Sequence, residues 1–208
     1  MKKVILARDT DVAHRIAQQT LATRGADYST EVRRLLDAGR EVMARNGTDS
    51  RARVADIVAA AGLSNDAFYR HFASKDALVV AILEDGTERL KSYLVHQMER
   101  ETTPVGQVRQ WIAGVLSQAS EESAATTLAV LWNAGTLHEH LNRASTSAPL
   151  ATLLHGPFTQ LGSAKPELDA LLVAHAVVGR LSELLWLHTH STDAEVDHLV
   201  EFCVRAVG

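Results

Sequence analysis

The sequence predicts an all-α protein, and two observations support that prediction. Apolar residues recur three or four positions apart along almost the whole of the 208 residues, which is the spacing of one helix face. No stretch alternates apolar and polar residues between turn signals, as a half-buried strand would. Because 46% of the residues are hydrophobic, the chain can bury one large core or two smaller ones.

Charge is distributed unevenly along the chain. Residues 1–75 contain 13 lysines and arginines against 9 acidic residues, whereas the remaining residues contain 8 against 16. A basic first third beside an acidic remainder favours contact of the first part with a polyanion such as nucleic acid.

The composition also indicates where the protein works. The single cysteine, Cys203, rules out an internal disulfide framework and favours a reducing compartment, so we expect the cytoplasm. The apolar run near the start is interrupted at Arg8 and is too short for a secretion signal. No run approaches the roughly 18 to 20 apolar residues that span a bilayer, so no membrane partner is expected.

The first elements are expected as follows. Residues 1–28 form a leader with a short amphipathic helix that ends near Gly25. Thr30 is a candidate N-cap of the next helix, which stops at Asn46 and the glycine that follows it.

Two short helices and a long one come next. The first covers residues 54–61 and ends at Gly62, where a left-handed residue is needed. The second is capped by Ser64, and Ser74 then caps a long helix over residues 75–97. Beyond Pro104 the expected helices are 105–119, 122–141, 148–161, 167–189 and 193–206.

Residues 54–78 have the layout of a helix-turn-helix. The three alanines at 59–61 let two helices approach, Gly62 makes the turn, and Leu63 and Phe68 fill the junction. The polar side of the second helix is then left free.

This segment resembles the signature of the tetracycline-repressor (TetR) family, in which a recognition helix ends in Tyr-x-x-Phe-x-x-Lys. The residues in register with that signature are Ile57, Gly62, Ser64, Tyr69, Phe72, Lys75 and Leu78. The resemblance, over about 50 residues, implies an N-terminal three-helix DNA-binding unit that a long helix joins to a C-terminal helical bundle for effector binding and dimerisation. The expected domains are an N-terminal extension of residues 1–28, a DNA-binding domain of residues 29–75, and a ligand-binding and dimerisation domain of residues 76–208.

The resemblance also implies which residues contact DNA. The start of the recognition helix faces base edges in the major groove, and the residues there are Ser64, Asn65, Asp66 and Ala67. Phosphate contacts are expected from Tyr69, His71 and Lys75.

Two residues depart from the family pattern. Arg53 precedes the second helix, where it could reach a phosphate or a base. Asp66 is unusual beside DNA, so it either accepts a hydrogen bond from a cytosine amino group, orients Arg70 or Arg53, or lies just outside the groove.

The later helices are expected to hold an effector pocket, since cavities between bundle helices are lined by aromatic residues and a few polar groups. The candidate ligand-binding residues are Trp111, Leu128, Trp132, Asn133 and His138. The tryptophan and leucine content favours a mostly apolar or aromatic molecule.

Long apolar stripes along the last two expected helices predict a homodimer, although such stripes can also be intramolecular core. The residues assigned to the dimer interface are Leu171, His175, Val178, Gly179, Trp186, Leu199, Val200 and Cys203. A helix-turn-helix monomer reads one half-site, and two-fold symmetry supplies the second.

The sequence contains no motif of a catalytic or metal site. It has no Gly-x-Ser-x-Gly elbow, P-loop or dinucleotide-binding glycine pattern, so we expect no enzyme, no catalytic residue and no cofactor. The two His-x-His pairs, at 138–140 and 188–190, lack the four-residue spacing of helical zinc sites, so no metal is expected.

Together these observations predict a transcriptional regulator, a homodimeric repressor that a small effector releases from a palindromic operator in double-stranded DNA. The effector is expected to shift the long helix at 75–97 and so change the separation of the two recognition helices. The alternative is a helical small-molecule carrier or enzyme with an incidental helix-turn-helix.

Overall fold

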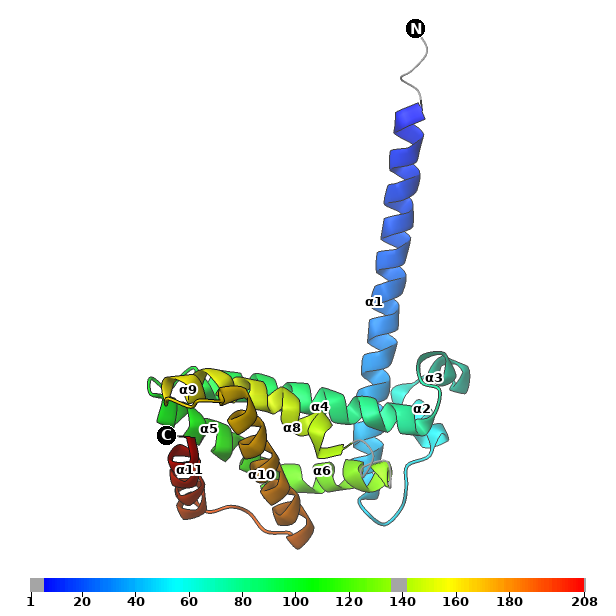
Figure 1. The fold of residues 1–208 in the computed structure, drawn as a ribbon. Coiled ribbons are helices and arrows are strands. Elements are labelled where there is room, and N and C mark those ends of the chain that lie inside the picture. The colour runs from blue at the N-terminus through cyan, green and yellow to red at the C-terminus, as the bar shows by residue number, and fades with distance from the viewer. Residues whose placement is uncertain (1–5, 136–141, 208) are drawn as a thin grey trace.

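The structure, a computed structural model, describes residues 6–135 and 142–207, and only the backbone at 6–24, 26, 121, 122 and 142–146. The described residues form helices joined by short connections, with no strand among them, which confirms the all-α fold. Figure 1 shows one long helix standing out from a body of shorter ones.

Helix α1 (Leu6–Asn46) is a single helix of 41 residues. The expected helix end near Gly25 and the expected cap at Thr30 are therefore wrong, because both residues lie inside α1. A glycine costs a helix interior only about 1 kcal/mol, which the helical residues on either side of Gly25 outweigh. The helix rises about 60 Å at 1.5 Å per residue, and its first half projects away from the body (Figure 1).

Helices α2 (Val54–Ala61) and α3 (Asn65–His71) follow α1 as the sequence predicts. Gly62 takes φ 60°, and its N–H bonds the carbonyl of Ala59, which ends α2 in the left-handed conformation expected there. The caps at Ser64 and Ser74 are confirmed, since each side chain accepts from the backbone N–H three residues on. Helix α4 (Lys75–Met98) begins directly after Ser74.

The remaining helices form the larger part of the body. They are α5 (Pro104–Leu116), a 3-10 turn (Ser117–Ala119), α6 (Glu121–Ala134), α8 (Asn142–Ala151), a second 3-10 turn (Thr152–Leu154), α9 (His155–Gln160), α10 (Pro166–Leu187) and α11 (Asp193–Val207). The expected helix over 122–141 is too long, because α6 ends at Ala134, where Gly135 takes φ 54°.

Buried residues divide into two cores. The N-terminal core consists of Leu35, Leu36, Ala38, Val42, Met43, Ala52, Ile57, Val58, Ala61, Phe68, Phe72, Leu78, Val79, Ile82, Ala129, Val130 and Ala134. The C-terminal core runs from Leu94 to Val207 and includes Trp111 and Phe158, both fully buried.

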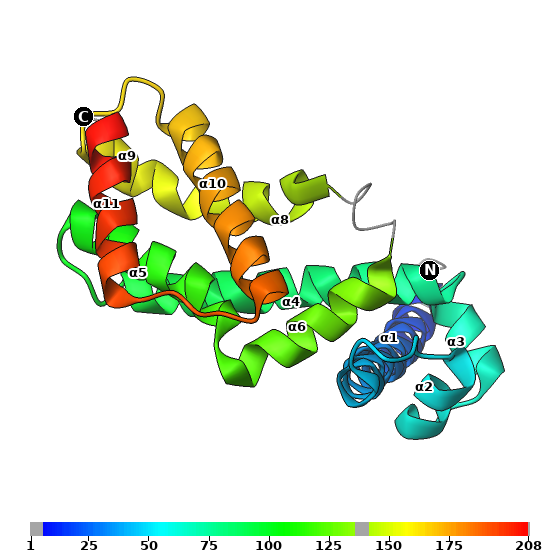
Figure 2. The ribbon, with the colours of Figure 1, turned by 90° about the horizontal axis from the view of Figure 1, so that it is seen from below.

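Helix α6 belongs to both cores. Leu128 packs in the C-terminal core, whereas Ala129 and Val130 pack in the N-terminal core against α1 and α4. Figure 2 shows α6 lying beside α4 and reaching α1 at its far end. The two cores are therefore joined by packing as well as by the continuous chain of α4.

Close packing between α1 and α4 depends on Gly39. A Cβ at Gly39 would come 2.8 Å from Cδ1 of Ile82 and 3.1 Å from Cδ2 of Leu78. Only glycine lets the two helices approach this closely without moving those side chains.

Candidate functional site

The turn between α2 and α3 is held by an arginine from α1. Nη2 of Arg34 donates to the carbonyl of Ala61 at 2.5 Å and to that of Gly62 at 3.1 Å. These carbonyls lie at the C-terminus of α2, where the helix dipole favours a positive charge. Arg34 therefore ties the turn between α2 and α3 to α1.

The first turn of α3 presents a short row of polar residues. Oγ of Ser64 accepts from the N–H of Ala67 at 3.1 Å, which orders the start of the helix. Asn65 and Asp66 are exposed, whereas Ala67 is buried in the protomer. The exposed residues of the predicted base-contacting row are therefore Ser64, Asn65 and Asp66.

Three further predicted contact residues surround that row. Tyr69 is 58% exposed, while its neighbour Phe68 is fully buried, so the two sides of α3 are cleanly divided. Lys75 begins α4, and Arg53 precedes α2 with an extended backbone and an exposed side chain. The hydroxyl, ammonium and guanidinium groups are of the kind that contact phosphates.

His71 lies differently from the other predicted phosphate contacts. Its side chain is only 2% exposed, and Nε2 lies 2.6 Å from Oε2 of Glu31 in α1. Arg70 donates to the same carboxylate at 3.0 Å, and the ring of Tyr28 packs edge-on against the imidazole. The hydrogen bond with His71, together with the charge of Arg70, lowers the pKa of Glu31 below its usual value. In this arrangement His71 ties α3 to α1 instead of facing outward.

The same ion pairs bear on Asp66. Arg70 pairs with Glu31, and Arg53 pairs with Asp56 at 3.0 Å, so neither arginine is oriented by Asp66. Of the three roles considered for Asp66, a contact with a cytosine amino group and a place just outside the groove remain.

An ion cluster joins α1 to α4 beside the N-terminal core. Its members, called the α1–α4 ion cluster, are Arg33, Asp37, Arg40, Asp85 and Arg89. Asp85 is the centre, since its carboxylate lies 2.6 Å from Arg33, 2.6 Å from Arg40 and 2.9 Å from Arg89. Burial alone would raise the pKa of Asp85, but the hydrogen bond from Arg33 and the three positive charges hold it below its usual value.

The α1–α4 ion cluster was missed by the sequence analysis, although part of it leaves a signal. Arg33 and Arg40 are seven residues apart on one helix face, and Asp85 and Arg89 have the spacing of a helical ion pair. That these pairs meet follows only from the crossing of α1 and α4, which no local pattern specifies.

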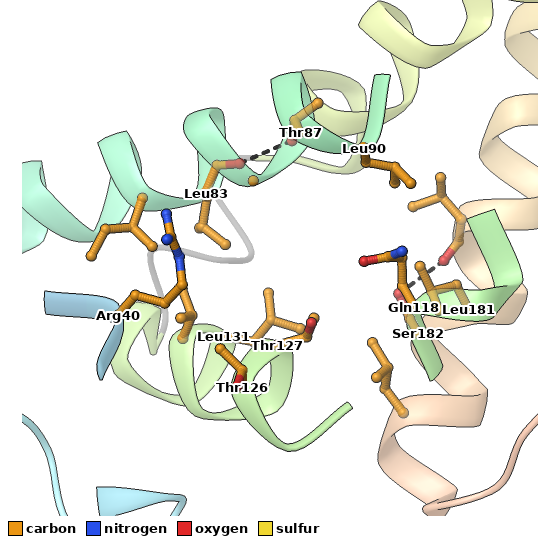
Figure 3. Close-up of a pocket in the computed structure, with 15 residues that line it drawn as sticks. Arg40, Leu83, Thr87, Leu90, Gln118, Thr126, Thr127, Leu131, Leu181 and Ser182 are labelled. Atoms are coloured by element: carbon orange, nitrogen blue, oxygen red, sulfur yellow. Dashed lines mark hydrogen bonds between the residues drawn. The ribbon is translucent and has the colours of Figure 1, made fainter. Parts of the chain in front are cut away.

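A cavity of about 210 Å³ lies between α4, α6 and α10. Its wall is mostly leucine, valine and isoleucine side chains, and Figure 3 shows Arg40 reaching it from α1, with Gln118 across from it. The hydroxyls of Thr87 and Ser182 line it too, but each donates to a carbonyl of its own helix. The cavity can therefore accept an apolar molecule with polar groups at its ends.

Four of the five residues predicted to bind a ligand, all but His138, do not line this cavity. Trp111 is fully buried, and its indole N–H donates to the carbonyl of Leu150, so it is part of the C-terminal core, as is Leu128. Oδ1 of Asn133 accepts from the buried N–H of Ala52, which ties α6 to the segment before α2. Trp132 is 41% exposed on the outside, and His138 lies outside the described residues.

The residues predicted to form a dimer interface divide into two groups. Val178, Val200 and Cys203 are buried within the protomer, and burial raises the pKa of the Cys203 thiol to about 11. The other predicted residues, Leu171, His175, Gly179, Trp186 and Leu199, are partly or fully exposed.

The exposed group lies on an apolar surface. Large apolar side chains that are about half exposed or more are Leu168, Leu172, Trp186 and Leu187 of α10 and Phe202 of α11. His175, Gly179 and Trp186 line an open groove of about 990 Å³ together with Trp132 of α6. Exposed apolar side chains beside an open groove are typical of an interaction surface.

By length and composition, one described helix, α10, could cross a membrane. Core helices of soluble proteins pass the same test, and one side of α10 packs in the C-terminal core through Ala170, Ala174 and Val177. Within the described residues, no group of three or more histidine, cysteine or acidic side chains could hold a metal ion.

Comparison with known proteins identifies the N-terminal part. Residues 35–82 match the sequence model of the bacterial regulatory proteins of the tetR family. No curated protein matches the chain.

Several solved structures share the fold. A TetR-family transcriptional regulator from Mesorhizobium loti aligns with a TM-score of 0.63 at 16% identity, over 86% of this chain and 96% of that one. RolR in complex with resorcinol aligns with a TM-score of 0.62 at 17% identity, over 88% of this chain and 90% of that one. FadR from Bacillus subtilis in complex with stearoyl-CoA aligns with a TM-score of 0.55 at 19% identity, over 82% of this chain and 96% of that one.

Proposed function

Because the chain belongs to the tetR family of bacterial regulatory proteins, we propose that it is a homodimeric repressor that a small, mostly apolar effector releases from a palindromic operator. The observation that supports this most is the first turn of α3, which is exposed and capped, and which follows a turn that Arg34 ties to α1. Its DNA partner is double-stranded, and its place of work is the cytoplasm.

The operator contacts divide between bases and phosphates. Ser64, Asn65 and Asp66 face base edges, since residues at the start of a recognition helix enter the major groove deepest. Tyr69, Lys75 and Arg53 contact phosphates and fix the register. We leave out Ala67 and His71, because both side chains are buried in the protomer.

A binding measurement tests this assignment. The full-length protein is titrated against a labelled duplex from the region flanking its own gene and against a shuffled duplex, at several salt concentrations. We expect saturable binding to the first duplex that weakens steeply with salt, because each phosphate contact releases counterions. Equal affinity for both duplexes would instead support a helical carrier or enzyme.

Two variants separate the two kinds of contact. Asn65→Ala is expected to lower operator affinity more than shuffled-duplex affinity, by about tenfold for a lost base contact worth 1–3 kcal/mol. Tyr69→Phe removes only a hydroxyl and is expected to weaken both duplexes alike.

The second copy is expected on the outer face of α10 and α11. That face carries exposed apolar residues such as Leu172, Trp186 and Phe202, and an isologous contact buries them in both copies at once. Gly179 lies in the middle of the face, and a Cβ there would meet nothing within 4 Å in the protomer.

Light scattering tests the dimer. Gly179→Arg is expected to give a folded monomer with weakened operator binding, because a charge replaces the closest approach of the two copies. Gly25→Arg, a control on α1 whose Cβ also meets nothing within 4 Å, should stay dimeric. A Gly179→Arg dimer would place the interface elsewhere.

The effector site is the cavity between α4, α6 and α10. Two proteins of the same fold hold a single-ring phenol and an acyl-CoA in their solved structures, and a volume of about 210 Å³ suits a molecule of the first size. A ligand there touches α4, so it can tilt the recognition helix, provided that it prefers the released state. Trp111, Leu128, Asn133 and His138 stay untested as ligand contacts.

A further inference from the structure

We infer that the effector is a single-ring carboxylic acid whose carboxylate binds Arg40 and competes with Asp85 for it. The inference rests on the proposed function, since it names the chemical class of the effector and the residue through which the effector acts. Arg40 is a residue of α1, yet its side chain lines the cavity between α4, α6 and α10 (Figure 3).

Charge inside the cavity favours an anion. Among the described lining residues, Arg40 is the one charged side chain; the others are apolar or carry a neutral hydroxyl or amide. An ionised group enters an apolar cavity only if it is paired there. A guanidinium forms two parallel hydrogen bonds with a carboxylate, so Arg40 is suited to that pairing.

Arg40 retains the capacity to bind a further acceptor. Its Nη1 donates to Asp37 at 3.2 Å and its Nη2 to Asp85 at 2.6 Å. Those bonds use two of the five N–H groups of a guanidinium, and the described residues supply no partner for the rest. The α1–α4 ion cluster also contains three arginines against two aspartates, so one added carboxylate balances its charge.

The size and the far end of the cavity define the rest of the ligand. An apolar cavity of about 150 Å³ in another protein holds benzene, so about 210 Å³ admits a ring with one or two small substituents. The amide of Gln118 stands across the cavity from Arg40 (Figure 3), and no described residue forms a hydrogen bond with it. A ring hydroxyl opposite the carboxylate would meet that amide.

Exchange of partners at Arg40 links the cavity to the recognition helix. Asp85 keeps Arg33 and Arg89 when Arg40 leaves, so no buried carboxylate is left unpaired. What is lost is the ion pair between Arg40 of α1 and Asp85 of α4. Arg40 directly follows Gly39, on which Ile82 of the cavity wall packs. A ligand at this point therefore loosens α1 against α4, the two helices that carry α2 and α3 between them.

The experiment compares acids with their neutral amides on the full-length protein without DNA. Benzoate, 4-hydroxybenzoate and phenylacetate are each titrated by calorimetry beside the corresponding primary amide, which has the same shape and no charge. We expect at least one acid to bind about tenfold or more tightly than its amide, and 4-hydroxybenzoate to bind more tightly than benzoate because of Gln118.

Two matched variants locate the contact. Arg40→Gln is expected to abolish the preference for acid over amide, whereas Arg33→Gln should keep it. Both arginines lie on α1 at 2.6 Å from Asp85, but only Arg40 lines the cavity. The thermal melt of each variant shows that it is folded.

The outcomes separate this inference from the proposed function. If no acid binds better than its amide, or if Arg40→Gln keeps the preference, the inference is wrong, whatever the protein does with DNA. If Arg33→Gln loses the preference as well, the effect comes from the ion cluster as a whole and the contact with Arg40 is overturned. The proposed function fails separately, if the unliganded protein shows no preference for its own flanking duplex.

Discussion

The N-terminal and C-terminal cores differ in how their polar groups are used. Around the N-terminal core the polar side chains are engaged with backbone and with each other: Ser64 and Ser74 cap helices, Arg34 holds the turn, and His71 binds Glu31. Where the two cores meet, a cavity is lined by residues of both, and there the amide of Gln118 is unengaged among the described residues. The comparison separates a region whose polar side chains hold one another in place from a junction where a polar group is open to a further partner.

The largest expected effect tests whether the two cores unfold together. Phe68→Ala and Phe158→Ala each remove a fully buried ring, one from each core, and each should lower the free energy of unfolding by about 3–5 kcal/mol. Because α6 packs in both cores, we expect a single transition in each variant, with circular dichroism and tryptophan fluorescence coinciding in urea. Separate transitions would mean that the shared helix does not couple the cores.

The next effect concerns the hydrogen bond that ties α6 to the segment before α2. Asn133→Ala leaves the buried N–H of Ala52 without its acceptor, so the free energy of unfolding should fall by about 1–3 kcal/mol. Asn65→Ala, an exposed asparagine on α3, is the control and should change it by less than about 0.5 kcal/mol. Both free energies of unfolding are measured in urea. Equal losses in the two variants would show that the hydrogen bond from Ala52 to Asn133 does not stabilise the fold.

A pair of glycine substitutions should have effects of opposite sign. Gly62→Ala puts a Cβ on a residue at φ 60° and 2.9 Å from Nη2 of Arg34, which should cost about 1–2 kcal/mol. Gly25→Ala lies inside α1 with open space around it and should stabilise the helix by about 0.5–1 kcal/mol. Thermal melts measure both, and a destabilised Gly25→Ala protein would favour a helix break at residue 25.

The smallest effect is a pH dependence that isolates the α1–α4 ion cluster. The pKa of Asp85 is lowered in the folded protein, so its contribution to stability is present above the unfolded value of about 4 and is lost as the pH falls through the folded value. Asp85→Asn should therefore be about 1 kcal/mol less stable than the wild type at pH 7, since Arg33 and Arg89 are half exposed and screened. Unfolding at pH 7 and at pH 3 checks that this gap narrows in acid, and a gap that widens contradicts the prediction.

The sequence predicted the N-terminal core better than the rest, and the reason is physical. Gly62, Ser64 and Ser74 act within three or four residues of themselves, so their roles can be read from local spacing. Arg40, which lines the cavity, and its partner Asp85 are 45 residues apart and meet only because α1 crosses α4. Helical periodicity gives the buried face of each helix but not the neighbour that covers it.

Packing between distant segments also decides the roles of single residues. Trp111 is predicted as a ligand contact because aromatic residues line pockets; in the structure its buried indole N–H donates to the carbonyl of Leu150, and its contact with a ligand stays a prediction. The helix end that the sequence predicts at Gly25 is wrong, whereas Gly39, fourteen residues later on the same helix, lets α4 approach α1. A glycine in a helical pattern has several meanings, and the neighbouring helix decides among them.

The length of α1 has a practical consequence for anyone who purifies this protein. A compact chain of 208 residues has a radius of gyration of about 17 Å, and residues 6–24 of α1 add a rod of roughly 28 Å outside that body. Such an appendage raises the friction of the tumbling particle far more than its mass. Gel filtration against globular standards would therefore overstate the molecular weight and make a monomer resemble a dimer. Light scattering and sedimentation equilibrium give a molecular weight that does not depend on shape.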